Sequence, residues 1–206
     1  MKLHHHSASP FVRMCLVTAH ETDMADEISL VPVGKFSPVV EHDRLVGDNP
    51  LGRVPALVTD HGHVLYDSRV ICEYICHRAG DKKLLPDEPV RRFRIMTLQA
   101  LGQGMADTAV LLRYEAALRP DALRWPDYVS RQQARLLRAA GDLQRRWLPE
   151  LREVNMGSIA VGAALGYLDF RHPAFDWRSA NPQLASWYES FAGRPSMVAT
   201  RPSDPA

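Results

Sequence analysis

The sequence has few cysteines, no long apolar run and almost no net charge. Three cysteines in 206 residues are too few for the disulfide scaffold of a small secreted protein. The longest nearly unbroken apolar stretch, residues 159–168, is half of the ~20 residues that a membrane-spanning helix needs. A net charge of +1 argues against a protein that binds nucleic acid through its overall charge. With no apolar signal segment near the first residues, we predict a cytoplasmic protein.

The two parts of the sequence differ in character. Residues 1–80 carry 7 basic and 10 acidic side chains in short strand-like runs separated by turns. Residues 81–206 carry 18 basic and 14 acidic side chains in long segments with helical periodicity. The segment 81–89 holds two prolines, which end one helix and start the next. We therefore predict an α/β domain over 1–80, a linker over 81–89 and an all-helical domain over 90–206.

The first domain has the pattern of a small sheet with helices, in the order β-α-β-loop-β-β-α. One helix begins at Ser9-Pro10, because serine is a favoured N-cap and proline a favoured first residue. Asp67 and Ser68 begin another helix. The predicted strands cover residues 2–6, 28–33, 54–59 and 64–66. The helices predicted in the second domain cover residues 90–118, 127–148, 159–170 and 182–191.

Three segments of the first domain carry residues suited to a peptide-like anion. Ser9 stands at a helix N-terminus, where unpaired amides and the helix dipole favour an anion and lower the pKa of a thiol. The Val54-Pro55 step favours a cis bond, which exposes backbone to an extended peptide. At Asp67 and Ser68, helix amides and a hydroxyl can hold a carboxylate while the aspartate pairs with an amino group. Each pattern alone also has a structural explanation, as a helix cap or a rigid turn.

Together these segments resemble the glutathione transferase family. Residues 9–13 (Ser-Pro-Phe-Val-Arg) match its serine-type N-terminal motif, and residues 49–57 match its Asn-Pro-x-Gly-x-Val-Pro-x-Leu segment. Residues 66–75 are similar to the start of its third helix, and residues 166–171 (Gly-Tyr-Leu-Asp-Phe-Arg) to a central helix in a bacterial branch. The resemblance implies a thioredoxin-like N-terminal domain that binds glutathione as co-substrate. It also implies an all-helical domain that completes a pocket for an electrophile, and a homodimer.

The resemblance assigns the chemistry to Ser9, whose hydroxyl would stabilise the glutathione thiolate, while Phe11 would face the pocket. A free thiol with a pKa of ~8.5 is only a few per cent ionised at neutral pH, so this stabilisation matters. Relatives that exchange disulfides have cysteine at the position of Ser9, and Cys15 lies six residues further on. The tyrosine-type mechanism is disfavoured as well, because no tyrosine precedes Tyr66.

The resemblance also assigns the residues that would bind the rest of glutathione. The backbone of Val54, before a cis Pro55, would pair with the cysteinyl residue. Asp67 and Ser68 would hold the γ-glutamyl end. Arg53 would hold the glycine carboxylate. Two other residues of the intervening loop compete for that last role: Lys35 and His42.

The predicted function is therefore a serine-type glutathione transferase in detoxification, acting on a small apolar electrophile. The resemblance leaves two alternatives open: a non-catalytic binding or regulatory module, and an isomerase or dehalogenase that uses the same thiolate. Isomerases of the family have two adjacent hydroxyl or thiol residues in this motif, whereas here Ala8 separates Ser7 from Ser9. We predict no nucleic-acid or membrane partner.

The second domain and the cysteines add three structural expectations. Where the family has a Ser/Thr-x-x-Asp capping box, this chain has Ser158 and Val161, which predicts a loss of ~1 kcal/mol at the central helix. Cys72 and Cys76 share a helix face and are predicted to pack in the core; no metal site is expected. A basic stripe on one helix is predicted to be solvated; it comprises Arg131, Arg135, Arg138 and Arg145.

Overall fold

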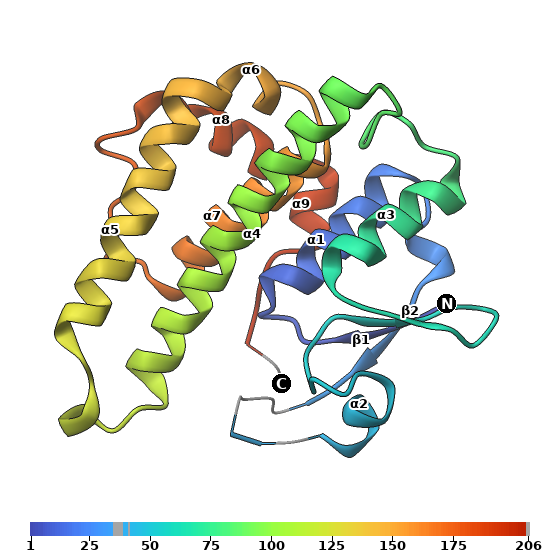
Figure 1. Cartoon of the computed structure of the whole chain (residues 1–206), viewed down its shortest axis with the longest axis horizontal. Helices are drawn as coiled ribbons and strands as arrows, with labels where there is room; N and C mark the ends of the chain where they lie inside the picture. The colour runs from blue at the N-terminus through green and yellow to red at the C-terminus, as the bar shows by residue number, and fades with distance from the viewer. Residues whose placement is uncertain (35–38, 41, 205–206) are drawn as a thin grey trace. The chain divides into compact units, whose positions relative to one another are not determined.

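The computed structural model describes residues 1–34, 39–40 and 42–204 and divides the chain into two compact units (Figure 1). Unit 1 consists of Met1–Asp87 and Pro195–Ala206, and unit 2 of Glu88–Arg194. The predicted division placed all residues after 89 with the helices. The structure instead groups the last ones with unit 1, because they pack along its first helix.

A four-stranded mixed sheet forms the centre of unit 1. Its strands have the order β2-β1-β3-β4. The central strand β1 pairs in parallel with β2 and antiparallel with β3, and β3 continues antiparallel to β4. The strands span the following residues: β1 Lys2–His5, β2 Ser29–Pro32, β3 Ala56–Val58 and β4 Val64–Leu65. All four strands lie inside the segments predicted from the sequence.

Helices cover both faces of this sheet. Their bounds are α1 Pro10–Glu21, η1 Ala25–Glu27, α2 Asp43–Asp48, α3 Ser68–Ala79 and α9 Pro195–Ala199. In Figure 1, α1 and α3 lie together on one side of the sheet and α2 on the other. Successive side chains of β1 point to opposite faces of the sheet. Leu3 is fully buried, and the next residue, His4, is 2% exposed. The Nε2 atom of His4 lies 2.5 Å from the carboxylate of Asp48 in α2.

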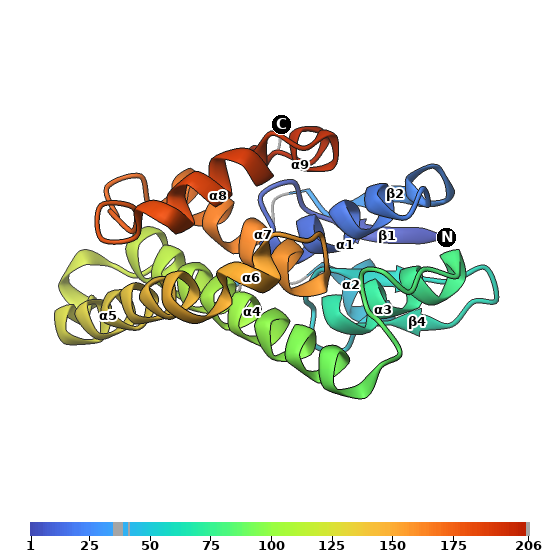
Figure 2. The ribbon, with the colours of Figure 1, turned by 90° about the horizontal axis from the view of Figure 1, so that it is seen from above.

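Unit 2 is a helical bundle around α7. Its elements are α4 Pro89–Ala117, η2 Asp121–Leu123, α5 Pro126–Asp142, a π-helical turn η3 Leu143–Trp147, α6 Leu148–Leu151, α7 Met156–Arg171 and α8 Pro182–Ala192. Figure 2 shows α7 between the α4–α5 pair and α8, and its first thirteen residues, 156–168, are all buried. The helix predicted over 127–148 is divided by the π-helical turn. Within the described residues, no helix combines the length and apolar character needed to cross a membrane.

The α4–α7 crossing depends on glycine. A Cβ atom built on Gly102 of α4 would lie 2.6 Å from the backbone nitrogen of Val161 and 2.7 Å from the carbonyl carbon of Ala160 in α7. For Gly104, two residues further along α4, no described residue has a heavy atom within 4 Å of such an atom. Gly102 therefore sets the distance between these two helices.

The start of α7 corrects the predicted capping defect. The N-cap is Asn155: its Oδ1 accepts a 2.9 Å bond from the Ser158 amide, and Ser158 Oγ accepts a 2.9 Å bond from the Asn155 amide. Both halves of a capping box are present, three residues before the position inferred from the sequence. Val161 lies in the second turn, fully buried, so it has no capping role.

We expect Asn155→Ala to destabilise unit 2 by ~1–2 kcal/mol, because it removes the acceptor for the Ser158 amide and the bonds that Asn155 Nδ2 donates to the Glu150 and Glu153 carbonyls. Asn155→Ser keeps a capping oxygen but loses the two bonds donated by Nδ2, so we expect it to lose less stability than Asn155→Ala. The measurement is urea unfolding. A loss with Asn155→Ser equal to that with Asn155→Ala would contradict the capping role.

Candidate functional site

Ser9 is the N-cap of α1, with extended backbone dihedrals of φ −76° and ψ 121°. Its Oγ accepts a 3.3 Å bond from the Val12 amide, and its carbonyl accepts a 3.0 Å bond from the Arg13 amide. The turn before it is closed by a 2.9 Å bond from the Ser9 amide to the His6 carbonyl. Among the described residues, the one hydrogen bond recorded for the Ser9 hydroxyl is the bond that it accepts from the Val12 amide, and no acceptor for its proton is recorded. The hydroxyl proton is therefore available to donate to an anion.

The segment before β3 presents open backbone. The Val54–Pro55 bond is cis, as the sequence predicted. In the part of the chain that the structure describes, no backbone hydrogen bond is recorded for the Val54 amide or carbonyl. The buried side chain of Asn49 organises the segment, donating to the Arg53 carbonyl (2.8 Å) and accepting from the Leu51 amide (3.1 Å). Asn49 belongs to the motif of residues 49–57, for which the sequence predicted no role at this position. Its two bonds form only in the folded loop, so the sequence did not indicate them.

Asp67 and Ser68 begin α3, as predicted. Asp67 is the N-cap and accepts a 3.0 Å bond from the Arg69 amide. Its other oxygen lies 3.1 Å from the Arg69 guanidinium, and the side chain is 49% exposed. Ser68 is only 1% exposed. Because Arg69 already contacts the Asp67 carboxylate, a ligand amino group bound to Asp67 would share that carboxylate with Arg69.

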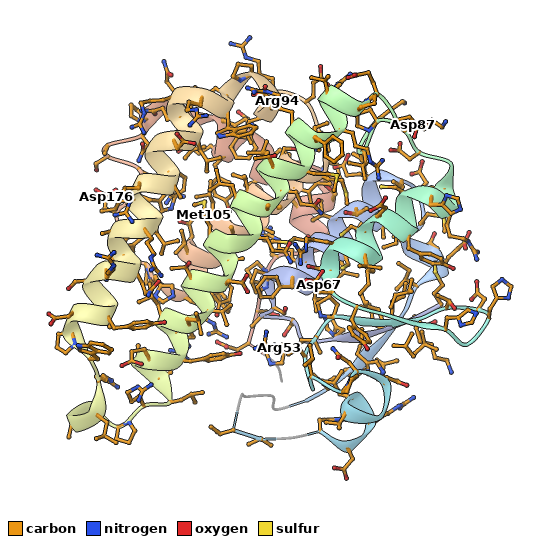
Figure 3. All side chains as sticks on the ribbon, viewed as in Figure 1. Arg53, Asp67, Asp87, Arg94, Met105 and Asp176 are labelled. Carbon is orange, nitrogen blue, oxygen red and sulfur yellow. The ribbon has the colours of Figure 1, made fainter. Side chains whose placement is uncertain are left out.

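The residues considered for a glycine carboxylate differ in their placement. Arg53 is exposed, on the chain that leads into β3, and Asp67 stands at the start of α3 (Figure 3). No ion pair of Arg53 is recorded in the described ranges. His42 is the N-cap of α2, and its Nδ1 atom is buried with no partner among the residues that the structure describes. Lys35 lies outside the described residues. Phe11, in the first turn of α1, is half-buried.

The three cysteines pack in the core of unit 1. Cys15 is fully buried on α1, and its Sγ atom lies 3.9 Å from that of Cys72 on α3. Burial raises the pKa of the Cys15 thiol, and it raises that of Cys76 to about 12. Among the described residues, no group of three or more metal-ligating side chains occurs. These thiols are therefore poorly suited to act as nucleophiles.

We expect all three thiols to resist a chromogenic disulfide reagent in the native protein and to react fully in denaturant. Burial excludes the reagent, and the raised pKa values of Cys15 and Cys76 keep those thiols protonated. His61→Cys, in an exposed turn, supplies a matched accessible thiol that should react at once. Rapid native reaction of any original cysteine would contradict the packing described here.

Both units of the chain are similar to domains of known proteins. Residues 8–78 match the model of the glutathione S-transferase N-terminal domain, and residues 126–190 match that of the C-terminal domain. The GST-like protein YibF of Escherichia coli (strain K12) is 32% identical over 206 residues, covering 98% of each chain. The chain belongs to the glutathione S-transferase family. The predicted family and its fold, a thioredoxin-like unit and a helical unit, are confirmed.

Two solved structures of a glutathione transferase family member from Pseudomonas fluorescens Pf-5 are similar over the whole chain. One, with bound glutathione, is 43% identical with a TM-score of 0.95 and covers 98% of both chains. The other, with bound S-(propanoic acid)-glutathione, is 42% identical with a TM-score of 0.91 and covers 98% of this chain and 100% of that one. Identity at this level extends the likeness beyond fold alone.

Proposed function

We propose that this chain is a glutathione transferase in which Ser9 stabilises the thiolate of bound glutathione. The observation that carries the proposal is the state of the Ser9 hydroxyl. Its oxygen accepts from the Val12 amide, and no acceptor for its proton is recorded among the described residues, so the hydroxyl can donate to a sulfur anion at the N-terminus of α1. A donor in this place favours the ionised thiol, as does the positive end of the helix dipole. The glutathione-bound relatives support the choice of ligand.

The remaining site residues would bind the glutathione peptide. The open amide and carbonyl of Val54 would pair with the cysteinyl backbone as an added strand. Asp67 would accept from the γ-glutamyl amino group, and amides at the start of α3, with Ser68, would hold its carboxylate. Arg53, for which the described part of the chain records no ion pair, would bind the glycine carboxylate. Phe11 would supply an apolar contact near the sulfur.

The proposed reaction is attack of the thiolate on a small apolar electrophile. The sulfur lone pair forms a carbon–sulfur bond, and either a leaving group departs with its electron pair or the electrons move onto an adjacent conjugated group that is then protonated. A conjugate of glutathione through its sulfur, such as the one bound to the Pseudomonas fluorescens relative, is the product type of this chemistry.

The test is an ultraviolet difference titration of the protein with glutathione from pH 5 to 9, following thiolate absorbance. We expect the bound thiol to ionise well below the free thiol's pKa of ~8.5. S-methylglutathione, which has no thiol, is the control: it should bind without this absorbance. Glutathione that binds without ionising, or that fails to bind, would favour the non-catalytic binding module instead.

We also propose that the enzyme is a homodimer. Two apolar residues at the start of α4, Val90 and Phe93, are exposed, and burial against a second copy would remove this surface from water. Sedimentation equilibrium measures the association state directly. We expect Phe93→Glu to shift the equilibrium toward monomer; a wild-type monomer at all concentrations would contradict the proposal.

A further inference from the structure

Residues 195–204, here called the return segment, lie along α1 in unit 1. At the far end of α1, the Ser196 hydroxyl donates a 2.5 Å bond to the Glu21 carboxylate. Just before α1 begins, the Ser7 hydroxyl donates a 2.9 Å bond to the Ser203 carbonyl. Figures 1 and 2 show α9 beside α1, and in Figure 1 the chain continues from α9 toward the start of α1. Near its end, the return segment therefore contacts Ser7, which lies two residues before Ser9 in the sequence.

Arg13 attaches the middle of the return segment. Its side chain is almost fully buried, at 5% exposure, and its Nη2 atom donates a 2.9 Å bond to the Met197 carbonyl. Its Nε atom lies 3.5 Å from Thr200 Oγ1, and that hydroxyl donates a 2.8 Å bond to the Ser196 carbonyl. A buried guanidinium needs such acceptors, because leaving it unsatisfied is costly. The return segment thus supplies hydrogen-bond acceptors to the buried Arg13 side chain.

Both contacts flank Ser9. Arg13 lies one turn after it, and the Arg13 amide donates to the Ser9 carbonyl. Ser7 lies two residues before it, in the turn closed by the bond from the Ser9 amide to His6. A segment attached on both sides of the N-cap restrains the position of the Ser9 hydroxyl. Catalytic geometry is sensitive to such restraint, since a displacement of about 1 Å can cost on the order of 100-fold in rate.

We propose that Arg13 is a positioning residue and that the return segment, through Arg13 and Ser7, holds Ser9 in place for the glutathione thiolate. This inference rests on the proposed function of Ser9. It adds residues 195–204, far away in the sequence, to the thiolate site. The segment touches no reacting atom; it acts by restraining the turn that contains the N-cap residue Ser9.

The test compares three variants by the pKa of the bound thiol, by kcat and by KM for glutathione. Arg13→Met removes the central attachment, and a stop codon at Arg201 removes residues 201–206 with the Ser203 contact while keeping Met197 and Thr200, the partners of Arg13. Val198→Ala, at an exposed position of α9, keeps all the contacts above and is the matched control. We expect Arg13→Met to raise the pKa of the bound thiol toward ~8.5 and to lower kcat about 10-fold or more, as displacement of a catalytic group does. KM should change less than kcat, the truncated chain should show a smaller change in the same direction, and Val198→Ala none.

A second readout needs no glutathione. Hydrogen exchange of the Val12 amide, which donates to Ser9 Oγ, should quicken in Arg13→Met and in the truncated chain but not in Val198→Ala. If wild-type protein forms no thiolate, the proposed function fails, and this exchange still decides whether the segment restrains Ser9. Folded variants with unchanged Val12 exchange and unchanged thiol pKa would overturn the inference. Should Arg13→Met fail to fold, the truncated chain gives the same decision.

Discussion

Ser9→Ala is expected to lower kcat/KM for conjugation by up to about 30-fold at neutral pH, because a thiol with the free pKa of ~8.5 is only a few per cent ionised there. The pKa of the bound thiol should rise toward the ~8.5 of a free thiol. The difference between the wild-type and variant rates is expected to depend on pH. Below the wild-type thiol pKa both rates fall together and the ratio of wild-type to variant rate stays at its largest value; between the two pKa values this ratio decreases as pH rises. Above pH ~8.5 both thiols are ionised, and the ratio of wild-type to variant rate approaches one.

This substitution also removes a helix cap, because Ser9 Oγ accepts from the Val12 amide. Alanine at an N-cap costs ~1 kcal/mol of stability, whereas glycine there costs only a few tenths. Ser9→Gly therefore separates the two roles: it should lose as much activity as Ser9→Ala and much less stability. Ser9→Thr keeps a hydroxyl and should retain part of the activity. If Ser9→Gly conjugates several electrophiles at the wild-type rate, the thiolate is stabilised elsewhere.

The features predicted well from the sequence are those that depend on neighbouring residues. The N-cap at Ser9, the N-cap at Asp67 and the cis bond before Pro55 each follow from two or three consecutive residues. The strands follow from short apolar runs bounded by turns. These local signals placed the residues of the candidate site on the elements where the structure has them.

Other features depend on distant residues or on weak local signals. The start of α7 was misplaced because the helix is apolar nearly all round, so periodicity does not mark its first turn, and Asn155 lies outside the apolar run. The helix α2, six residues long, is too short for a periodic pattern. The partners of Arg13 lie 184 and 187 residues away, and no sequence period connects them. The role of the return segment could be seen only in the folded chain.

The second large effect concerns Gly102. We expect Gly102→Ala to destabilise unit 2 by ~3 kcal/mol, at the upper end of the cost of overpacking a core. The added Cβ would lie 2.6 Å from the Val161 nitrogen, and a backbone atom in the buried part of α7 cannot move aside as a flexible side chain can. Gly104→Ala is the matched control on the same helix. Within the described structure nothing lies within 4 Å of the added Cβ, so this substitution should stabilise the protein by ~0.5–1 kcal/mol through helix propensity.

A compensating substitution tests the cause of the Gly102→Ala effect. The Cβ of Ala160 would lie 2.9 Å from the new methyl group, farther than the backbone atoms at 2.6 and 2.7 Å. Adding Ala160→Gly therefore removes one clash and leaves the two closer ones, so it should fail to restore the free energy of unfolding in urea. Full restoration would mean that the side chain of Ala160, not the backbone of α7, limits the approach of α4. Opposite signs for Gly102→Ala and Gly104→Ala would show that contact with α7, rather than helix propensity, determines which glycine α4 requires.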